Sequence, residues 1–357
     1  MNKEQKIKEL LDHLQETEGE GFKWNEAELL EEVRKDESEK ASLATKVLSI
    51  AGGFIATISF IGFIFTAGLD KSEIMLLFTG LVLIGGAIYV NKEYDKLILD
   101  TSAISAYVMG FFLLGIGMSQ FKLDLNVIWM TFILISVATL FITQGNILSF
   151  ISVIITSGSF ISLIISNKNY DLIHLYNAVC SILLIWSYLN EAKIISLSKE
   201  ICKLYNPVRT GLIFSLIIGL FVVGKRDLVK ISSDYVWLSS VVTIPILIYL
   251  IYRVIQVIEI RNLKLEILIY SLIALVLLPT AFAPAISGAL LILLVSFFVN
   301  YKTGIALGII ATIYFISQYY YDLNLTLLVK SLILVSTGIL FLVFYYLTNQ
   351  SKTNEEV

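Results

Sequence analysis

The chain has 357 residues, of which 57% are hydrophobic and only 15% are charged, and its mean hydropathy is +0.82. A soluble domain carries about 25% charged residues, whereas this chain contains successive apolar segments of about twenty residues, each long enough to cross a hydrocarbon layer about 30 Å thick. A soluble enzyme, a secreted disulfide scaffold and a nucleic-acid-binding protein are therefore excluded. The sequence predicts an all-α, polytopic transmembrane helical bundle.

The chain opens with a charged arm, residues 1–45, whose composition differs from everything after it. The arm holds thirteen acidic and seven basic residues, which leaves 16 of the 29 acids and 19 of the 26 bases for the rest. Its net charge is therefore −6 and that of the remainder +3, which argues against a polybasic lipid anchor. Apolar residues follow a helical spacing from Ile7 to Leu14 and again from Trp24 to Val33. We expect an acidic, amphipathic cytosolic arm that either packs on the membrane domain as a helical hairpin or docks a partner protein.

A transmembrane helical domain, residues 46–357, is expected to follow the arm. Its apolar runs are continuous and about twice as long as a strand of a membrane barrel requires, which favours helices. The runs predict about twelve helices. The expected spans are residues 46–68, 74–90, 98–118, 126–142, 147–165, 172–189, 208–224, 235–252, 265–282, 285–300, 303–319 and 325–347.

The distribution of basic residues predicts the orientation of these spans, because cytosolic loops of membrane proteins are enriched in Lys and Arg. With the arm in the cytosol and twelve crossings, 19 Lys and Arg residues lie on the inner side and 6 on the outer side. Without the arm and Lys46 the ratio is still 11 to 6. We therefore expect both termini in the cytosol.

The longest predicted inner connection, residues 190–207, has a helical pattern of its own. Its apolar residues between 194 and 204 fall on one face, which is typical of a helix that lies on the membrane surface. Pro207 is expected to end this helix. The connection then either joins two halves, residues 46–189 and 208–347, or serves as an ordinary amphipathic linker.

Lys330 is a cation inside the last predicted span. If this span starts near Leu325, Lys330 lies about 7–8 Å below the outer surface, at a rise of about 1.5 Å per residue. A charge at this depth costs a few kcal/mol unless it is solvated or paired. Two interpretations remain open: the side chain extends to the lipid headgroups, or it pairs with an acid on another helix, for which Asp171 is the better-placed candidate.

Asp171 and His174 are three residues apart at the start of the sixth predicted span, so they share a helix face. His174 is the only histidine within a predicted span, and histidine side chains in general titrate near neutral pH. The two residues therefore form either a hydrogen-bonded structural pair near the membrane surface or a proton relay.

The fifth predicted span is rich in hydroxyl residues. Ser149, Ser152, Thr156 and Ser159 fall on one helical face. Small hydroxyl residues allow helices to approach closely and to form hydrogen bonds with one another. The alternative interpretation is a polar wall along a solute path, with the helix locally unwound at residues 156–159.

Short motifs near the end of the chain carry a resemblance to a known family. Residues 284–286 (PAI) precede an apolar hairpin, and the motifs QYYYDL at 318–323 and TLLVKS at 326–331 follow it. These motifs, with the opening of the first span at residues 46–54, resemble a bacterial multi-pass membrane family, domain of unknown function 4401. The resemblance implies a multi-helix protein of the bacterial inner membrane. It also implies a membrane assembly, because members of the family are encoded with a related membrane domain and a small protein with a Gly-Asp-Tyr signature.

The sequence contains no phosphate-binding glycine loop, HExxH zinc-binding helix, CxxC pair or nucleophile elbow. We therefore expect no enzymatic activity, no cofactor and no metal. The expected partners are the lipid bilayer and a membrane or cytosolic protein bound through the arm.

Two functions remain open at this point. The acidic arm, the sparse intramembrane charge and the family resemblance favour a scaffold or accessory subunit of a bacterial membrane assembly. The number of spans, the hydroxyl-rich fifth span and a weak inverted echo between residues 91–95 and 167–171 favour a transporter or flippase for a small or lipid-like solute.

Overall fold

The regions that can be described in the computed structural model are residues 72–93, 97–143, 145–225, 237–257 and 263–322, together with scattered residues within 52–68 and 326–342. All regular secondary structure in these regions is helical. The predicted arm, residues 1–45, and most of the first and last predicted spans lie outside the described residues.

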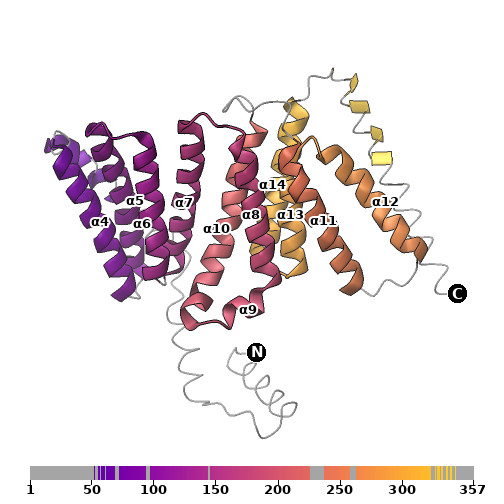
Figure 1. Ribbon diagram of the computed structural model, residues 1–357, viewed down its shortest axis with the longest axis horizontal. Coiled ribbons are helices and arrows are strands. Elements are labelled where there is room, and N and C mark those ends of the chain that lie inside the picture. Colours follow the sequence, from indigo (N-terminus) through magenta and orange to yellow (C-terminus); the bar gives the residue numbers. More distant parts are fainter. Residues whose placement is uncertain are drawn as a thin grey trace, which may run out of the picture. The chain divides into compact units, whose positions relative to one another are not determined.

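Eleven helices can be followed through the described part of the chain (Figure 1). Their bounds are α4 Glu73–Glu93, α5 Leu97–Gln120, α6 Leu125–Ile142, α7 Asn146–Ser166, α8 Leu172–Leu189, α9 Glu191–Ile195, α10 Lys199–Gly224, α11 Leu238–Val257, α12 Leu263–Thr280, α13 Pro284–Phe298 and α14 Lys302–Asp322. Ten of them correspond to the second to eleventh predicted spans, and α9 belongs to the predicted inner connection. Within the described residues, eight helices are long and apolar enough to cross a membrane, namely α4, α5, α6, α7, α8, α10, α11 and α14. The chain is therefore a multi-pass membrane protein.

The helix ends follow from local sequence. Asp124 precedes α6 and accepts a hydrogen bond from the backbone N–H of Asn126, and Ser198 precedes α10 and accepts one from the N–H of Ile201. Beyond the ends of α5, α7 and α13 the backbone turns through a residue with positive φ. These residues are Lys122, Lys168 and Asn300.

The inner connection, residues 190–207, differs from the prediction. α10 begins at Lys199 and continues through Pro207, so the predicted end of a helix at Pro207 is wrong. A proline inside a helix removes only its own N–H bond and crowds the preceding turn, and membrane helices tolerate this where neighbouring groups hold the helix. Here contacts hold the turns on both sides of Pro207, because the Tyr205 hydroxyl donates to the carbonyl oxygen of Ser187 and Arg209 donates to Glu191.

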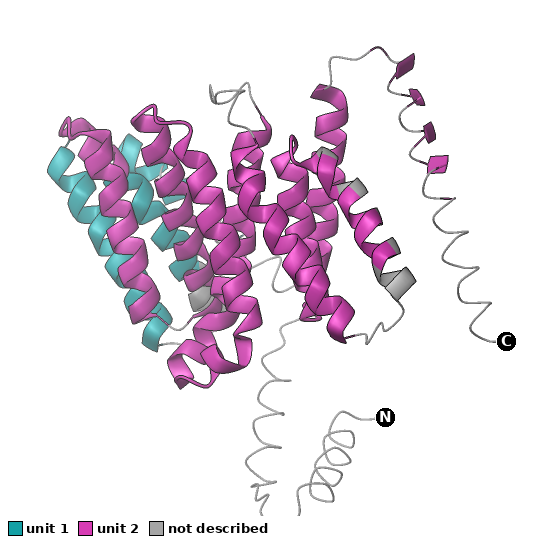
Figure 2. Cartoon of the chain, turned by 45° about the vertical axis from the view of Figure 1, so that its right-hand side comes forward, with its two compact units in different colours: residues 1–114 teal, residues 115–357 magenta. Residues whose placement is uncertain are grey.

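The chain divides into two compact units, residues 1–114 and 115–357 (Figure 2). Residues 190–207 lie inside the second unit. The two units therefore do not coincide with the predicted halves 46–189 and 208–347.

The second unit is organised around α10, which contacts α7, α8, α13 and α14. Its apolar core contains fully buried leucine and isoleucine side chains from several of these helices. They include Leu184 of α8, Ile213, Leu216 and Leu220 of α10, and Leu291 and Ile292 of α13. α8 lies against α10, α11 and α13, so a polar side chain on the inner face of α8 is enclosed by these three helices.

In the first unit, α4 and α5 are in direct backbone contact at Gly80 and Gly110. A Cβ atom at position 80 would lie 2.9 Å from the Gly110 carbonyl oxygen and 2.9 Å from the Leu114 nitrogen. Because both atoms belong to the backbone of α5, no side chain can move aside to make room. Glycine is therefore required at position 80 for this helix spacing.

We expect Gly80→Ala to lower the free energy of unfolding by about 1–3 kcal/mol, the usual cost of overpacking. The matched control is Gly85→Ala in the same helix, because a Cβ there meets nothing within 4 Å. Thermal unfolding of the purified chain in detergent measures both changes. Equal unfolding midpoints for the two variants would contradict this packing.

Candidate functional site

A row of five residues, four of them polar, runs along one face of α8. His174, Asn177, Ser181, Leu184 and Tyr188 are separated by alternating steps of three and four residues, which keeps them on one side of the helix. All five are buried. The row spans fourteen residues, or about 21 Å along the axis at about 1.5 Å per residue, which is most of a hydrocarbon layer.

At the first end of the row, a hydroxyl network joins α8 to its neighbours. His174 Nδ1 lies 2.7 Å from Ser239 Oγ on α11. One turn further along α11, Thr243 Oγ1 lies 3.0 Å from Ser287 Oγ on α13. Ser240 Oγ donates to the carbonyl oxygen of Thr280 on α12. These bonds tie α11 to three other helices.

The next turns of the row carry polar atoms without partners. His174 Nε2, both amide atoms of Asn177 and Ser181 Oγ are buried and have no hydrogen-bond partner among the described residues. Asn177 packs on Gly219 of α10, because a Cβ atom at position 219 would collide with Oδ1 of Asn177. An unpaired polar group costs about 1–3 kcal/mol when it is buried. Three such side chains in succession are therefore an expensive arrangement for a face that only packs.

The far end of the row is a cage of three tyrosines around Arg209, which we call the Arg209 cage. The guanidinium carbon of Arg209 lies 3.8 Å from the ring centre of Tyr301, 4.9 Å from that of Tyr205 and 5.6 Å from that of Tyr188. A cation over an aromatic face is attracted by the ring quadrupole, more strongly where water is excluded. Only 8% of Arg209 is exposed.

Polar contacts complete the Arg209 cage. Arg209 Nη1 donates to Glu191 Oε1 over 3.2 Å, and Nη2 donates to the side-chain oxygen of Asn206. Tyr301 is fixed in turn, because its hydroxyl lies 2.8 Å from Thr210 Oγ1. The ion pair offsets part of the cost of removing the guanidinium from water.

The predicted pair of Asp171 and His174 is arranged differently. Asp171 is exposed at the start of α8, whereas His174 is buried with Ser239 as the partner of its ring. The shared helix face thus brings the two residues near each other but gives them different surroundings. Lys330, for which Asp171 is the candidate partner in one of the two interpretations, lies outside the described residues.

The hydroxyl residues of the predicted fifth span lie in helix seams. Thr156 Oγ1 is 2.7 Å from Ser136 Oγ on α6 and also donates to the carbonyl oxygen of Ser152. Ser152 and Ser159 are buried. α7 is helical without interruption from Asn146 to Ser166, so the predicted local unwinding at residues 156–159 is wrong. These contacts favour the packing interpretation for Ser152, Thr156 and Ser159.

Ser157, which follows Thr156 in α7, takes part in a polar contact that links three helices. Ser157 of α7 is hydrogen-bonded to the hydroxyl of Tyr176 on α8. That hydroxyl donates in turn to the carbonyl oxygen of Ser215 on α10. The row on α8 is therefore held against α7 and α10 by a fixed polar contact.

Sequence reasoning missed Asn177, Ser181, Tyr188 and Arg209. The spacing of the first three from His174 was readable in the sixth span and could have indicated the row. Arg209 could not be recognised from spacing, because it was placed among the basic residues at the inner membrane surface. Its cage depends on Tyr301, which precedes α14 and is brought in only by the tertiary fold.

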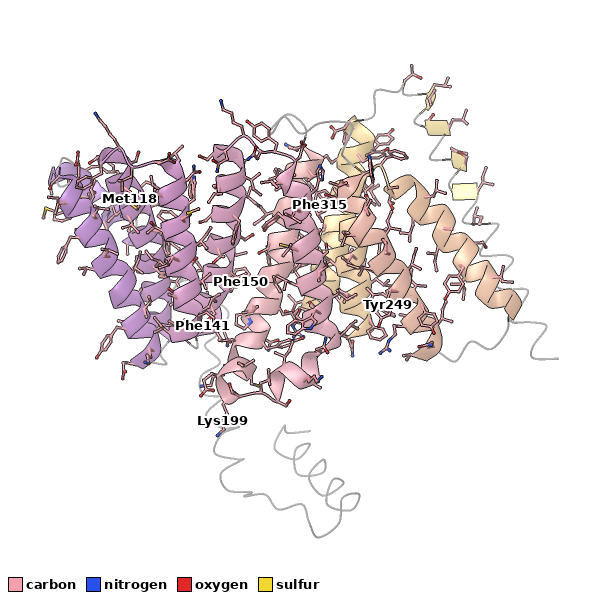
Figure 3. All side chains as sticks on the ribbon, in the orientation of Figure 1. Met118, Phe141, Phe150, Lys199, Tyr249 and Phe315 are labelled. Atoms are coloured by element: carbon pink, nitrogen blue, oxygen red, sulfur yellow. The ribbon has the colours of Figure 1, made fainter. Side chains whose placement is uncertain are left out.

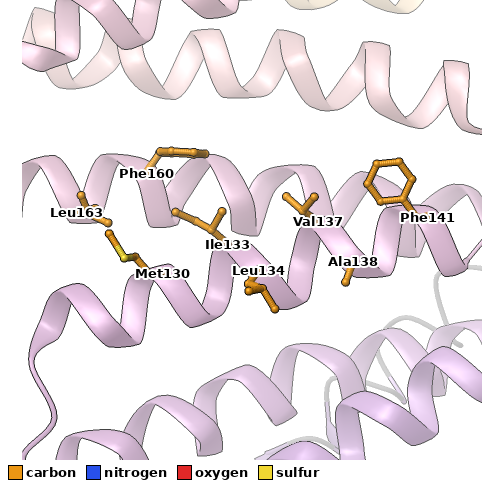
Figure 4. A pocket seen from close by; sticks show the side chains of 8 residues that line it. All are labelled: Met130, Ile133, Leu134, Val137, Ala138, Phe141, Phe160 and Leu163. Carbon is orange, nitrogen blue, oxygen red and sulfur yellow. The ribbon is translucent and has the colours of Figure 1, made fainter.

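An open apolar groove of about 690 Å³ lies along α6 and α7 (Figure 4). It is lined only by apolar side chains: Met130, Ile133, Leu134, Val137, Ala138, Phe141, Phe160 and Leu163. Such a surface suits lipid chains or an apolar helix and carries no reactive group. The described residues also contain no cluster of three or more His, Cys, Asp or Glu side chains that could hold a metal ion.

Comparison with known proteins gives one result. A family model described as Domain of unknown function (DUF4401) matches residues 42–351. The match covers all the helices from α4 to α14 and therefore the row on α8 and the Arg209 cage at its far end. No curated protein and no solved structure matches the chain.

Proposed function

The chain belongs to the DUF4401 family, and from this premise we propose that its membrane domain passes a small, uncharged polar solute along the α8 row. The observation that carries the proposal is the succession of buried, unpartnered polar atoms at His174, Asn177 and Ser181. A solute with hydrogen-bonding groups would satisfy these atoms in turn. Apolar residues would fill the same positions at lower cost if packing were their only role.

The chemistry of the row favours an uncharged solute. Between His174 and Tyr188 the buried face of α8 offers amide and hydroxyl groups that both donate and accept hydrogen bonds. It offers no Asp, Glu, Lys or Arg, and an ion at this depth would need such a group for compensation. The cation at the far end, Arg209, is already paired with Glu191.

Passage along the row requires movement of the helices. His174 is 2% exposed at one end and Arg209 is 8% exposed at the other, so both ends are closed in this structure. Access from alternate sides is the usual solution for membrane transporters with a buried site.

Asn177→Leu tests the proposal through two readouts of opposite sign. The exchange replaces two unpaired polar atoms with methyl groups and keeps the number of heavy atoms, so we expect the free energy of unfolding to rise by about 1–2 kcal/mol. We also expect the variant to lose solute flux, because the row then lacks its central amide. Flux is measured by light scattering after proteoliposomes are mixed with urea or glycerol.

The control for this experiment is Thr156→Val, which removes a half-buried hydroxyl from the α6–α7 seam and should keep the flux of the native chain. Vesicles without protein give the background. Native protein that is no faster than empty vesicles for either solute would overturn the proposed passage. Full flux in Asn177→Leu would remove the α8 row as its route.

We further propose that the chain lies in the bacterial cytoplasmic membrane with both termini in the cytosol. The basic residues support this orientation, because Lys193, Lys199 and Lys203 all lie at the α8–α10 connection on the predicted inner side. Cys202 is exposed at this connection, whereas Cys180 is buried in α8. The chain thus contains its own reporter of sidedness.

A membrane-impermeant maleimide should label Cys202 only after the membrane of spheroplasts is permeabilised. Cys180 should stay unlabelled under both conditions because its side chain is enclosed by neighbouring helices. Cys202→Ser provides the control, since it should abolish the signal. Labelling of Cys202 in intact spheroplasts would reverse the proposed orientation.

A second candidate function is a non-enzymatic scaffold or accessory subunit of a membrane assembly. The net charge of −6 on residues 1–45 favours it, because an acidic amphipathic arm suits a basic protein partner better than an anionic membrane surface. In this function the arm binds the partner and the membrane domain anchors it.

Deletion of residues 1–40 should abolish co-purification of such a partner and leave membrane insertion intact, because the apolar spans are unchanged. Affinity purification from membranes followed by mass spectrometry measures the first effect, and membrane fractionation measures the second. A set of co-purifying proteins that is unaffected by the deletion would rule out docking through the arm.

A further inference from the structure

We infer that the Arg209 cage is a binding site for a phosphate oxyanion, supplied either by a lipid headgroup or by free phosphate. The inference goes beyond the proposed passage and does not depend on it, because binding is measured on the purified chain without any flux. It rests on the donor groups of the cage, on the way Glu191 occupies it, and on the position of the cage along α10.

The guanidinium of Arg209 is incompletely used. It has five N–H donors in a planar fork, a geometry that matches the oxygens of phosphate and carboxylate groups. Nη1 contacts Glu191 and Nη2 contacts Asn206, whereas Nε is buried and has no hydrogen-bond partner in the described part of the chain. The edge of the fork that includes Nε is therefore unpaired inside the protein.

Two further donors belong to the same cluster. The hydroxyls of Tyr188 and Ser296 are near each other but lack a hydrogen bond of standard geometry among the described residues. Tyr188 is 2% exposed and Ser296 is fully buried. These two hydroxyls and Nε of Arg209 are a set of buried groups that can each donate a hydrogen bond. An oxyanion has the several lone pairs that such a set requires.

The aromatic rings hold the guanidinium in place without using its N–H groups. Tyr301 and Tyr205 contact its face at 3.8 and 4.9 Å. Arg209 can therefore exchange one oxyanion for another at its edge while its face remains stacked. A lysine would not retain this arrangement, because its ammonium group is a compact charge without a fork.

Glu191 occupies part of the site as an internal oxyanion. Its carboxylate makes a single contact with Arg209, Nη1 to Oε1 at 3.2 Å, and its side chain is 30% exposed. It belongs to α9, which has only five residues. Glu191 also interacts with Tyr205, but it contacts the fork through one nitrogen, so an oxyanion that binds the fork through two can displace it.

The surroundings attract anions. Between residues 190 and 209 the chain has four bases and two acids, a net charge of +2. Three of these bases are exposed, namely Lys193, Lys199 and Lys203. A positive surface around a partly enclosed site raises the local concentration of anions.

The position along α10 fits a membrane interface. α10 has 26 residues and is therefore about 39 Å long, whereas the hydrocarbon layer is about 30 Å thick. Its first residue, Lys199, is at the lower end of the helix in Figure 3, beside the short α9. Arg209 lies ten residues, or about 15 Å, further on, and its guanidinium contacts Glu191 of α9, the short helix that packs against α10.

The first test follows thermal unfolding of the full-length chain in detergent as inorganic phosphate is added. We expect a saturable rise in the unfolding midpoint for the native chain. Glu191→Gln should bind phosphate about tenfold more tightly, because the competing carboxylate is removed. Arg209→Lys should lose the saturable response although it keeps the charge, and Lys199→Gln, which changes only surface charge, should bind within about twofold of the native chain.

The second test identifies the lipid source. The chain is reconstituted in vesicles of equal phosphatidylglycerol and phosphatidylcholine, extracted again, and its retained lipids are quantified by mass spectrometry. Enrichment of phosphatidylglycerol that is lost in Arg209→Lys indicates the headgroup as ligand, whereas a response to inorganic phosphate alone indicates the free ion.

Absence of both responses in the native chain and in Glu191→Gln would overturn the inference. Circular dichroism verifies that Arg209→Lys is folded. If that variant does not fold, the comparison of Glu191→Gln with the native chain decides, and equal phosphate affinities would then overturn the role of Glu191 and of the site.

Discussion

The hydrocarbon layer offers no water to a polar group, and this constraint shapes the whole chain. Each backbone N–H and C=O must bond within its own segment, so the spanning segments are helices. Polar side chains must then find partners between helices. In the first unit, Gly80 and Gly110 carry no side chain, so the backbones of α4 and α5 pack directly against each other. The second unit places hydroxyl, amide and guanidinium groups in its seams.

The second unit contains polar seams of two kinds that differ in how completely they are satisfied. Between α6 and α7, Ser136 and Thr156 bond to each other and to carbonyl oxygens one turn earlier in their own helices. These two hydroxyls are satisfied, although Ser149 Oγ of α7 is also buried without a partner among the described residues. Along α8, by contrast, Asn177 and Ser181 keep polar atoms without partners. A hydroxyl-rich sequence therefore does not show by itself whether its polar atoms find partners.

The sequence predicts those features of the fold that depend on local sequence patterns. Hydropathy alone located ten of the described helices, eight of which are long and apolar enough to cross a membrane, because an apolar run and the helix that it forms have nearly the same length. It failed at Pro207, where neighbouring buried residues rather than local propensity keep α10 continuous. It gave the face of His174 but not its partner, Ser239, which is 65 residues away. The Arg209 cage is likewise a product of tertiary packing and has no local signature.

The alternating spacing of three and four residues in the α8 row makes the row rotate slowly around the helix. A repeat of seven residues falls short of two full turns of an α-helix by about 20°, so over its two repeats the row rotates by about 40° around α8. The neighbours of the row differ along its length: His174 faces Ser239 of α11, whereas Asn177 and Tyr188 face Gly219 and Arg209 of α10. One helix face thus leads from a neutral hydroxyl surrounding to a cationic aromatic one, so the two ends of the row differ in chemistry.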